Sequence, residues 1–277
     1  MTLEVRDLKK DFRLRNGLRT SVLHAVKGAS FTLEPGRTIA LVGESGSGKS
    51  TIARMIAKLE RPTSGQILLD GEPSGTRGAA LARYRSDVQM VFQDPFASLN
   101  PFHSIGHHIE RPLRIHHPGM GNADIRRRTL ELLERVRLTP ADNFAERRPH
   151  ELSGGQRQRV AIARALAPGA RFIIADEPVS MLDVSIRLGV LNLLADLQRS
   201  ENLGVLYITH DLATARHFSD EILVMYHGDI VERGPADDVI LNPQHDYTKT
   251  LLSAAPEPQN LGRLREEVQR ELAEAAS

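Results

Sequence analysis

A glycine-rich stretch between two apolar segments constrains this 277-residue chain more than any other feature. The run Ile39–Val42 is typical of a buried strand, and residues 52–57 are typical of a helix that begins near Lys49. Residues 43–50 between them read Gly-Glu-Ser-Gly-Ser-Gly-Lys-Ser. The order of strand, glycine-rich loop, Lys-Ser and helix predicts a phosphate-binding loop. A plain Gly/Ser surface turn is the alternative, and the flanking strand and helix argue against it.

The residue types in this loop suit a polyphosphate. Its glycines can adopt positive φ and leave room for backbone N–H groups to surround an anion. The helix that follows adds free N-terminal amides and the positive end of its dipole. Lys49 can bring a charge to the β- and γ-phosphates, and the Ser50 hydroxyl can ligate Mg²⁺. We therefore expect ATP or another nucleoside triphosphate to bind with Mg²⁺. The loop residues expected to bind it are Gly43, Ser45, Gly46, Ser47, Gly48, Lys49, Ser50 and Thr51.

Composition narrows the functional classes. A net charge of +1 argues against binding to nucleic acid through charge alone. No apolar run approaches the roughly 18 residues of a membrane-spanning helix, and no apolar signal segment stands at the N-terminus. The chain has no Cys, which excludes disulfides, thiolate zinc sites and cysteine-ligated iron–sulfur clusters. The expected compartment is the cytoplasm.

The remaining pattern alternates strands and helices. Short alternating pieces over residues 1–35, with a hairpin signal at Asn16-Gly17, predict a small antiparallel sheet. Helical patterns over 97–155, broken by prolines such as Pro112, predict an inserted helical subdomain. Other expected strands cover 66–69, 88–92, 172–175, 204–208, 222–226 and 230–232; expected helices cover 49–59, 156–166, 184–199 and a last amphipathic segment with Leu261 and Leu272; residues 72–79 and those after Gly234 are expected as loop or coil.

Two further stretches carry chemistry. The strand predicted over 172–175 ends in Asp176 and Glu177. An acidic residue in this position, Asp176, can hold Mg²⁺ through water beside a phosphate loop, and Glu177 can deprotonate the attacking water. The alternative is an acidic pair that faces solvent. Residues 152–156, Leu-Ser-Gly-Gly-Gln, place a hydroxyl and two glycines before a helix, which suits either a second anion site or a plain N-cap at Ser153.

Residues 152–156 resemble the signature motif of ATP-binding cassette (ABC) ATPases. The loop 43–50, Gln93, the signature, Asp176-Glu177 and His210 follow one another in that family's order, so the resemblance covers about residues 1–235. It implies a head-to-tail dimer. In such a dimer each ATP lies between the phosphate loop of one subunit and the signature of the other, formed by Ser153, Gly154, Gly155 and Gln156.

The resemblance also implies individual roles. Phe12 resembles the aromatic residue that stacks on adenine, although tyrosine is commoner there and a core Phe is the alternative. Gln93 resembles the glutamine that touches Mg²⁺ and senses a transmembrane partner. Asp183 resembles an aspartate that lies across the dimer interface, with Met181 standing where alanine is usual. His210 resembles the catalytic histidine that contacts the γ-phosphate; a lone His at a strand end is otherwise unremarkable.

The implied architecture is an α/β fold with a P-loop NTPase (RecA-like) core, an N-terminal antiparallel β subdomain, an inserted helical subdomain and a C-terminal extension. The ATPase domain would cover residues 1–235, the helical subdomain about 97–155 and the extension 236–277. Stretches 92–95 and 98–101, together with the tail His245–Leu252, are similar to the dipeptide/oligopeptide and nickel branch of ABC importers. The cysteine-ligated cluster of some members is not carried over.

Membership of that branch would imply several partners. They are two transmembrane permease subunits, a second ATP-binding subunit (a copy or a paralogue) and an extracytoplasmic substrate-binding protein. The chain would then sit peripherally on the cytoplasmic face of the inner membrane. Peptides, nickel or oligosaccharides remain open as cargo. A soluble ABC-type ATPase that acts on DNA or the ribosome is a different hypothesis; such relatives carry two cassettes or long coiled-coil or zinc insertions. An exporter motor is a third.

Two charged or titratable clusters stay outside these motifs. Five histidines fall between residues 103 and 117, and His103 with His107 has the i, i+4 spacing of two metal ligands on a helix. No acidic cluster accompanies them, so solvated or partner-contacting histidines are the favoured interpretation. The run Arg126–Arg128 predicts a solvated helix face.

Overall fold

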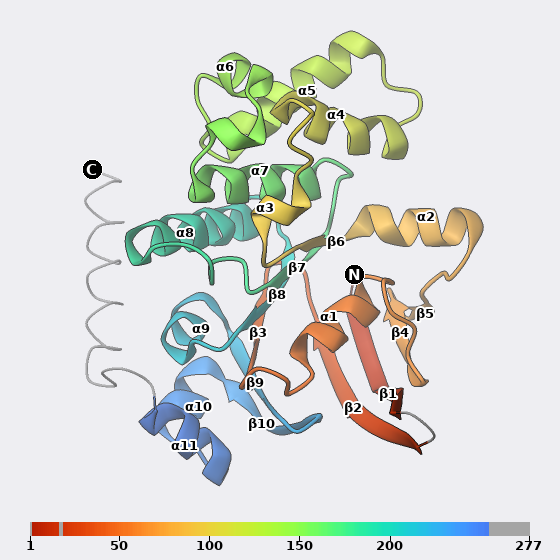
Figure 1. Cartoon of the computed structure of the whole chain (residues 1–277), viewed down its shortest axis with the longest axis vertical. Coiled ribbons are helices and arrows are strands. Elements are labelled where there is room, and N and C mark those ends of the chain that lie inside the picture. Colours follow the sequence, from red (N-terminus) through yellow and green to blue (C-terminus); the bar gives the residue numbers. More distant parts are fainter. Residues whose placement is uncertain (1, 17–18, 255–277) are drawn as a thin grey trace.

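Two sheets and a set of helices make up the computed structural model, which describes residues 2–16 and 19–254. The first sheet has six strands in the order β10-β9-β3-β8-β7-β6 (Figure 1). Its strands are β3 (Thr38–Val42), β6 (Val88–Val91), β7 (Phe172–Asp176), β8 (Gly204–Thr209), β9 (Glu221–Tyr226) and β10 (Asp229–Pro235). All pairings are parallel except that of β10 with β9. Every residue of β3, β7 and β8 is buried, as expected for parallel strands covered on both faces.

The antiparallel sheet predicted at the N-terminus is confirmed, with longer strands than the sequence suggested. Its order is β2-β1-β4-β5, with β1 (Leu3–Asn16), β2 (Arg19–Leu33), β4 (Ser64–Leu69) and β5 (Glu72–Pro73). The interrupted alternation of apolar and polar residues predicts several short strands. In the structure, bulges in the β1–β2 pairing absorb these interruptions, so both strands continue. Gly17 of the expected hairpin turn lies outside the described residues, as does the amphipathic helix expected around residues 261–272.

Helices lie on both faces of the six-stranded sheet. Figure 1 shows α4, α5 and α6 at one end of the molecule, and α7 contacts both α4 and α5. The helices are α1 (Lys49–Ile56), α2 (Gly78–Asp87), α3 (Pro95–Ser98), α4 (Ile105–His116), α5 (Asn122–Arg135), α6 (Ala141–Glu146), α7 (Gly154–Leu166), α8 (Val184–Ser200), α9 (Leu212–Phe218), α10 (Ala236–Leu241) and α11 (Asp246–Ser253), with a 3₁₀ turn at Pro149–Glu151.

Several expected boundaries are wrong. The loop expected over 72–79 contains β5 and the start of α2, and the coil expected after Gly234 contains α10. The helix expected over 49–59 ends at Ile56. Pro112 does not break α4, although it removes a backbone donor from the helix. Ile105, Ile109 and Leu113 lie on one face at four-residue spacing and are fully buried, which offsets that loss.

The core lies on both faces of the six-stranded sheet. Ala40 and Val42 pack in the layer that contains α7 and α8, while Ile39 and Leu41 pack in the layer that contains α1 and the antiparallel sheet. This period-two division places β3 between two apolar layers. The loop that follows Val42 therefore starts from one of the most firmly held positions in the fold.

Candidate nucleotide site

Three neighbouring strands end at the candidate site. β3, β8 and β7 are consecutive and parallel, so their carboxyl ends meet at one edge of the sheet. The predicted phosphate loop follows β3, and His210 follows β8. Asp176 and Glu177 stand at the end of β7. The fold thus brings together motifs that are more than a hundred residues apart in sequence.

Close backbone approach explains two glycines of the loop. At Gly43 a Cβ would lie 2.2 Å from the Met225 carbonyl oxygen. At Gly48, where φ is 112°, a Cβ would lie 2.3 Å from the Ala25 carbonyl oxygen. Gly48 is also the N-cap of α1 and has no side chain to satisfy the first amides of that helix. A tightly held loop with free helical amides is a suitable cradle for an anion.

Lys49 is held inside this loop. Its side chain is 4% exposed, and Nζ donates hydrogen bonds to the Gly43 and Glu44 carbonyl oxygens at 2.6 and 2.8 Å. Burial lowers the pKa of Lys49, while nearby carboxylates, of which Glu177 has the largest effect, act in the opposite direction. Phosphate oxygens could replace the carbonyls as acceptors for this ammonium group.

Ser50 and Asp176 form a pair of oxygen donors. Ser50 Oγ donates a hydrogen bond to Asp176 Oδ1 at 3.0 Å. Asp176 is 7% exposed, and this burial raises the pKa of its carboxyl, with the charge of Glu177 acting in the same direction. The Ser50 hydrogen bond opposes the shift. A hydroxyl and a carboxylate oxygen in contact are the hard ligands that Mg²⁺ prefers, so the donor set fits that ion.

Glu177 is the meeting point of the predicted catalytic residues. Its Oε2 accepts a hydrogen bond from Gln93 Nε2 at 3.0 Å and lies 3.5 Å from His210 Nδ1. Its backbone has a φ of 44°, and its N–H donates to the Ile208 carbonyl oxygen at 3.0 Å. The carboxylate is thereby fixed between two side chains that come from other parts of the chain. Such a carboxylate can orient and deprotonate a water molecule.

A cleft of about 860 Å³ contains most of these groups. Phe12 lines it, together with predicted residues Ser45, Gly46, Gly48, Lys49, Ser50, Thr51, Gln93, Glu177 and His210. The Phe12 ring has Lys10 Nζ 4.8 Å from its centroid, a cation–π contact. Sequence reasoning missed Leu23, His24, Ala25, Glu44, His227, Gly228, Leu251 and Ala254 as lining residues. Glu44 belongs to the predicted phosphate loop and Leu251 to the tail motif, whereas no local motif marks the others, which reach the cleft through sheet pairing and chain folding.

The predicted signature residues lie outside this cleft. Ser153 caps α7, where its Oγ accepts from the Gln156 N–H at 3.3 Å and Gln156 Oε1 accepts from the Ser153 N–H at 2.9 Å. Packing explains Gly155, because a Cβ there would lie 2.4 Å from Ile186 Cγ2. Gly154 and Asp183, the N-cap of α8, are also absent from the lining. Within one chain, the signature and the phosphate loop therefore do not share a pocket.

The histidines at 103–117 and the arginines at 126–128 make ordinary ring and ion-pair contacts. The His103 and His107 rings stack at 4.1 Å between centroids. Within residues 2–16 and 19–254, no group of three or more His, Cys, Asp or Glu side chains is arranged to hold a metal ion. The arginines at 126–128 lie on α5 and pair with carboxylates of Asp142, Asp124 and Glu131.

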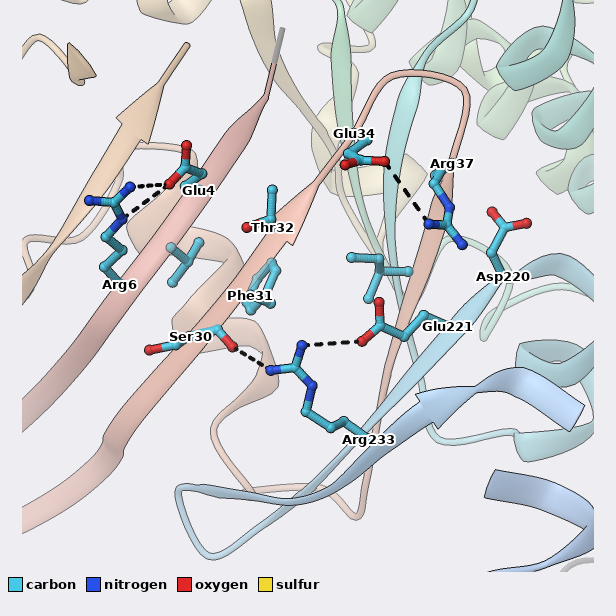
Figure 2. A pocket seen from close by; sticks show the side chains of 12 residues that line it. Glu4, Arg6, Ser30, Phe31, Thr32, Glu34, Arg37, Asp220, Glu221 and Arg233 are labelled. Carbon is cyan, nitrogen blue, oxygen red and sulfur yellow. Dashed lines mark hydrogen bonds and ion pairs between the residues drawn. The ribbon is translucent and has the colours of Figure 1, made fainter. Parts of the chain in front are cut away.

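A second pocket, of about 380 Å³, lies near the start of β3 (Figure 2). It opens between the antiparallel sheet and β9–β10, at the end of β3 opposite the phosphate loop. Its arginines are engaged: Arg37 lies 4.0 Å from Glu34, and Arg233 lies 3.7 Å from Glu221 (Figure 2). This charged pocket is separate from the nucleotide cleft.

None of the helices in the described part of the chain is long and apolar enough to cross a lipid bilayer.

Sequence comparisons agree with this geometry. The family described as "ABC transporter" matches residues 26–180, and "Oligopeptide/dipeptide transporter, C-terminal region" matches residues 231–276. The glutathione import ATP-binding protein GsiA of Salmonella typhimurium is 50% identical over 92% of this chain, which spans only 41% of that relative. The oligopeptide transport ATP-binding protein OppF of Escherichia coli is 47% identical over 92% of this chain and 78% of the relative.

Solved structures show the same fold. A dimeric ATP-binding cassette in a post-hydrolysis state with ADP and Pi matches with a TM-score of 0.73 and 31% identity, covering 84% of this chain and 98% of that one. The cbiO1 protein of Clostridium perfringens, part of an ABC transporter complex, matches with a TM-score of 0.74 and 27% identity, covering 87% and 90%. The predicted α/β architecture of a P-loop ATPase is thereby confirmed.

Proposed function

This chain belongs to the ABC transporter family, and we propose that it is the ATP-hydrolysing subunit of an importer for dipeptides or oligopeptides. The proposal that peptides are the transported substrate rests on the match of residues 231–276 to the C-terminal region of oligopeptide/dipeptide transporters. The relatives named for glutathione and oligopeptide import support it. In this proposal residues 1–235 are the ATPase domain, with the helical subdomain at about 97–155, and residues 236–277 are the extension.

The cleft provides the groups for hydrolysis of ATP. Lys49 and the amides of α1 would hold the phosphates, and Ser50 with Asp176 and Gln93 would hold Mg²⁺. The ion would supply charge neutralisation at the phosphate oxygens. Glu177 would accept the proton of the attacking water, and its contacts with Gln93 and His210 keep its carboxylate in place. Phe12 would stack on the base.

A second subunit is needed to complete the site in this proposal. Ser153, Gly154, Gly155 and Gln156 begin a helix outside the cleft, where they are available to a nucleotide held by another chain. Asp183 would lie at the same interface. The match to a cassette solved as a dimer supports this arrangement. The second subunit is either a copy of this chain or a paralogue.

Coupling to a membrane partner is supported by a cleft of about 650 Å³ beside Gln93. Apolar side chains are exposed there, with Phe92 at 39% and Ile115 at 58%. Exposed apolar groups in a cleft suit a partner helix. We assign this cleft to one of the two permease subunits, which would place the chain peripherally on the cytoplasmic face of the inner membrane and link it to an extracytoplasmic binding protein. Nucleic acid has no part in this proposal.

Reconstitution tests the proposal. The chain is assembled in proteoliposomes with the permease subunits and binding protein encoded beside it, and ATP hydrolysis is measured with added dipeptides, glutathione, nickel or an oligosaccharide. We expect a peptide ligand to stimulate hydrolysis severalfold. Stimulation by nickel alone or by the oligosaccharide alone would show that this ligand, and not a peptide, is the transported substrate. A chain that assembles with no membrane protein and is stimulated by DNA or ribosomes would overturn the importer assignment.

A further inference from the structure

The segment around α11 touches the phosphate loop, and nothing in the proposed hydrolysis uses that contact. The hydroxyl of Tyr247 accepts a hydrogen bond from the Glu44 backbone N–H at 3.0 Å, across 203 positions of sequence. Tyr247 is 9% exposed, and its ring stacks on that of Tyr226 with centroids 4.0 Å apart. Leu251 and Ala254, farther along the same segment, line the nucleotide cleft.

The approach of Tyr247 is fixed by a carboxylate on β10. Glu232 accepts hydrogen bonds from the backbone N–H groups of Gln244 and His245, at 2.7 and 3.0 Å. Burial alone would raise the pKa of Glu232, but these backbone donors contribute to a net lowering, so the carboxyl stays ionised at neutral pH. The His245 ring then accepts from the Tyr247 N–H at 3.1 Å and caps α11. The start of the segment is therefore anchored to the sheet.

The contact falls on a peptide group that also holds the catalytic lysine. Gly43 C=O and Glu44 N–H belong to one peptide plane. Lys49 Nζ donates to the carbonyl oxygen of this plane, and Tyr247 accepts from its N–H. The plane is thus fixed at both ends, and hydrogen bonds in such a chain polarise one another. A phosphate that takes Lys49 away from Gly43 leaves the Tyr247 bond to hold the plane.

We propose that Tyr247 is a positioning residue of the nucleotide site, through which the C-terminal segment preorganises the phosphate loop. This inference rests on the proposed function, since it concerns the affinity of the same loop for ATP. The tail motif His-Asp-Tyr thereby acquires a physical role in the ATPase. A loop already in its binding shape loses less conformational freedom when the phosphates arrive, so affinity rises without a new contact to the nucleotide.

Tyr247→Phe tests the inference because it removes the hydroxyl and keeps the stacked ring. Tyr226→Phe is the matched control, since it removes a hydroxyl from the other ring of the same stack. Burial raises the pKa of Tyr247, so the lost bond is one between neutral groups. We expect Tyr247→Phe to weaken binding of Mg-ATP, and to raise KM, about two- to tenfold. Its kcat at saturating ATP and its melting temperature should stay near those of the control.

Hydrogen exchange provides a readout that does not depend on nucleotide. The Glu44 amide should exchange severalfold faster in Tyr247→Phe than in the wild type or in Tyr226→Phe. Unchanged exchange and unchanged affinity in Tyr247→Phe would overturn the inference while leaving the ATPase proposal intact. Equal effects in both variants would also overturn it, because they would indicate a general loss of packing. Wild-type protein that fails to bind ATP, with Glu44 exchange still dependent on Tyr247, would instead remove the proposed function.

Discussion

The N-termini of α1 and α7 both lie in Ser- and Gly-containing stretches, yet their first amides are capped differently. α1 starts from Gly48, which offers no side-chain cap, and its first residue Lys49 is folded into the loop. α7 starts from Ser153, which exchanges hydrogen bonds with Gln156 in a closed capping box. One helix thus leaves its amides to an external anion, while the other satisfies part of its own N-terminus.

This difference would make the two proposed anion sites unequal. The loop at α1 needs no rearrangement of a side-chain cap before a phosphate binds. The capping box at α7 occupies the amides of Ser153 and Gln156, so fewer amides of that helix are free for a ligand, and those of Gly154 and Gly155 lie outside the box. In the proposed dimer, α1 would therefore contribute most of the affinity for ATP. α7 would act mainly as a sensor that the nucleotide of the partner chain is in place.

The largest expected effect comes from Glu177, the proposed base, which would act when α1 of one chain and α7 of another hold the same nucleotide. Glu177→Gln should lower kcat about 10²- to 10⁴-fold, because the amide cannot accept the proton of water. ATP binding should persist, and the two N-termini should stay together in a closed dimer detectable by size-exclusion chromatography with Mg-ATP. Every ATPase copy in the complex must carry the change. Glu44→Gln removes the same charge in the same cleft and should keep turnover near normal; normal turnover in Glu177→Gln would remove the proposed base.

The affinity of the α1 half can be tested directly. Lys49→Ala should weaken ATP binding about ten- to hundredfold, the effect of losing hydrogen bonds to a charged group. Titration calorimetry of the purified chain measures it. Lys58→Ala, two residues beyond the C-terminal end of α1 and outside the cleft lining, is the control. Unchanged affinity in Lys49→Ala would contradict the phosphate-loop assignment.

Ser153→Ala tests whether α7 is more than a capped helix. Loss of the cap should lower the free energy of unfolding by about 1 kcal/mol. Ser104→Ala, which removes a comparable cap from α4, should cost a similar amount. Only Ser153→Ala should also lower turnover of the assembled dimer, about tenfold, while a single chain keeps its ATP affinity. Equal turnover in the two variants would reduce Ser153 to a plain cap.

The smallest effect concerns stability. Burial raises the pKa of Asp176, so folding disfavours its ionised form, and the stability linked to it is lost as pH rises through the raised pKa. Asp176→Asn cannot ionise and should raise the melting temperature by about 2 °C at neutral pH. The advantage should shrink on acidification as wild-type Asp176 takes up a proton. Thermal unfolding between pH 4 and pH 8, without Mg²⁺, measures it; a gap that widens toward low pH would show the wrong sign.

Local sequence was enough for the residues that end apolar runs. The loop at 43–50 and His210 follow buried apolar strands and Asp176 ends one, and the ends of parallel strands gather at one edge of a sheet. Their meeting in one cleft follows from the fold class. Phe12 could be placed only by resemblance, because no pattern within β1 separates a base-stacking ring from a core ring.

Other features depend on contacts that no window of sequence contains. His24 and Leu23 reach the cleft because the long pairing of β1 with β2 carries them there. The helix through Pro112 persists because three buried side chains outweigh one missing donor. Tyr247 lies in the tail motif, but its bond to Glu44 joins positions 203 apart and depends on the three-dimensional path of the tail.

The strand order also sets a length scale for the chemistry. β8 lies between β3 and β7, so the loop that grips phosphate and the carboxylate that faces water stand two strand spacings apart, about 10 Å. His210 directly follows β8, the strand between them. The backbone hydrogen bonds between the strands thereby set the distance between these groups. Side chains at the strand ends can be substituted, but the sheet fixes the distance between the phosphate loop and the proposed base.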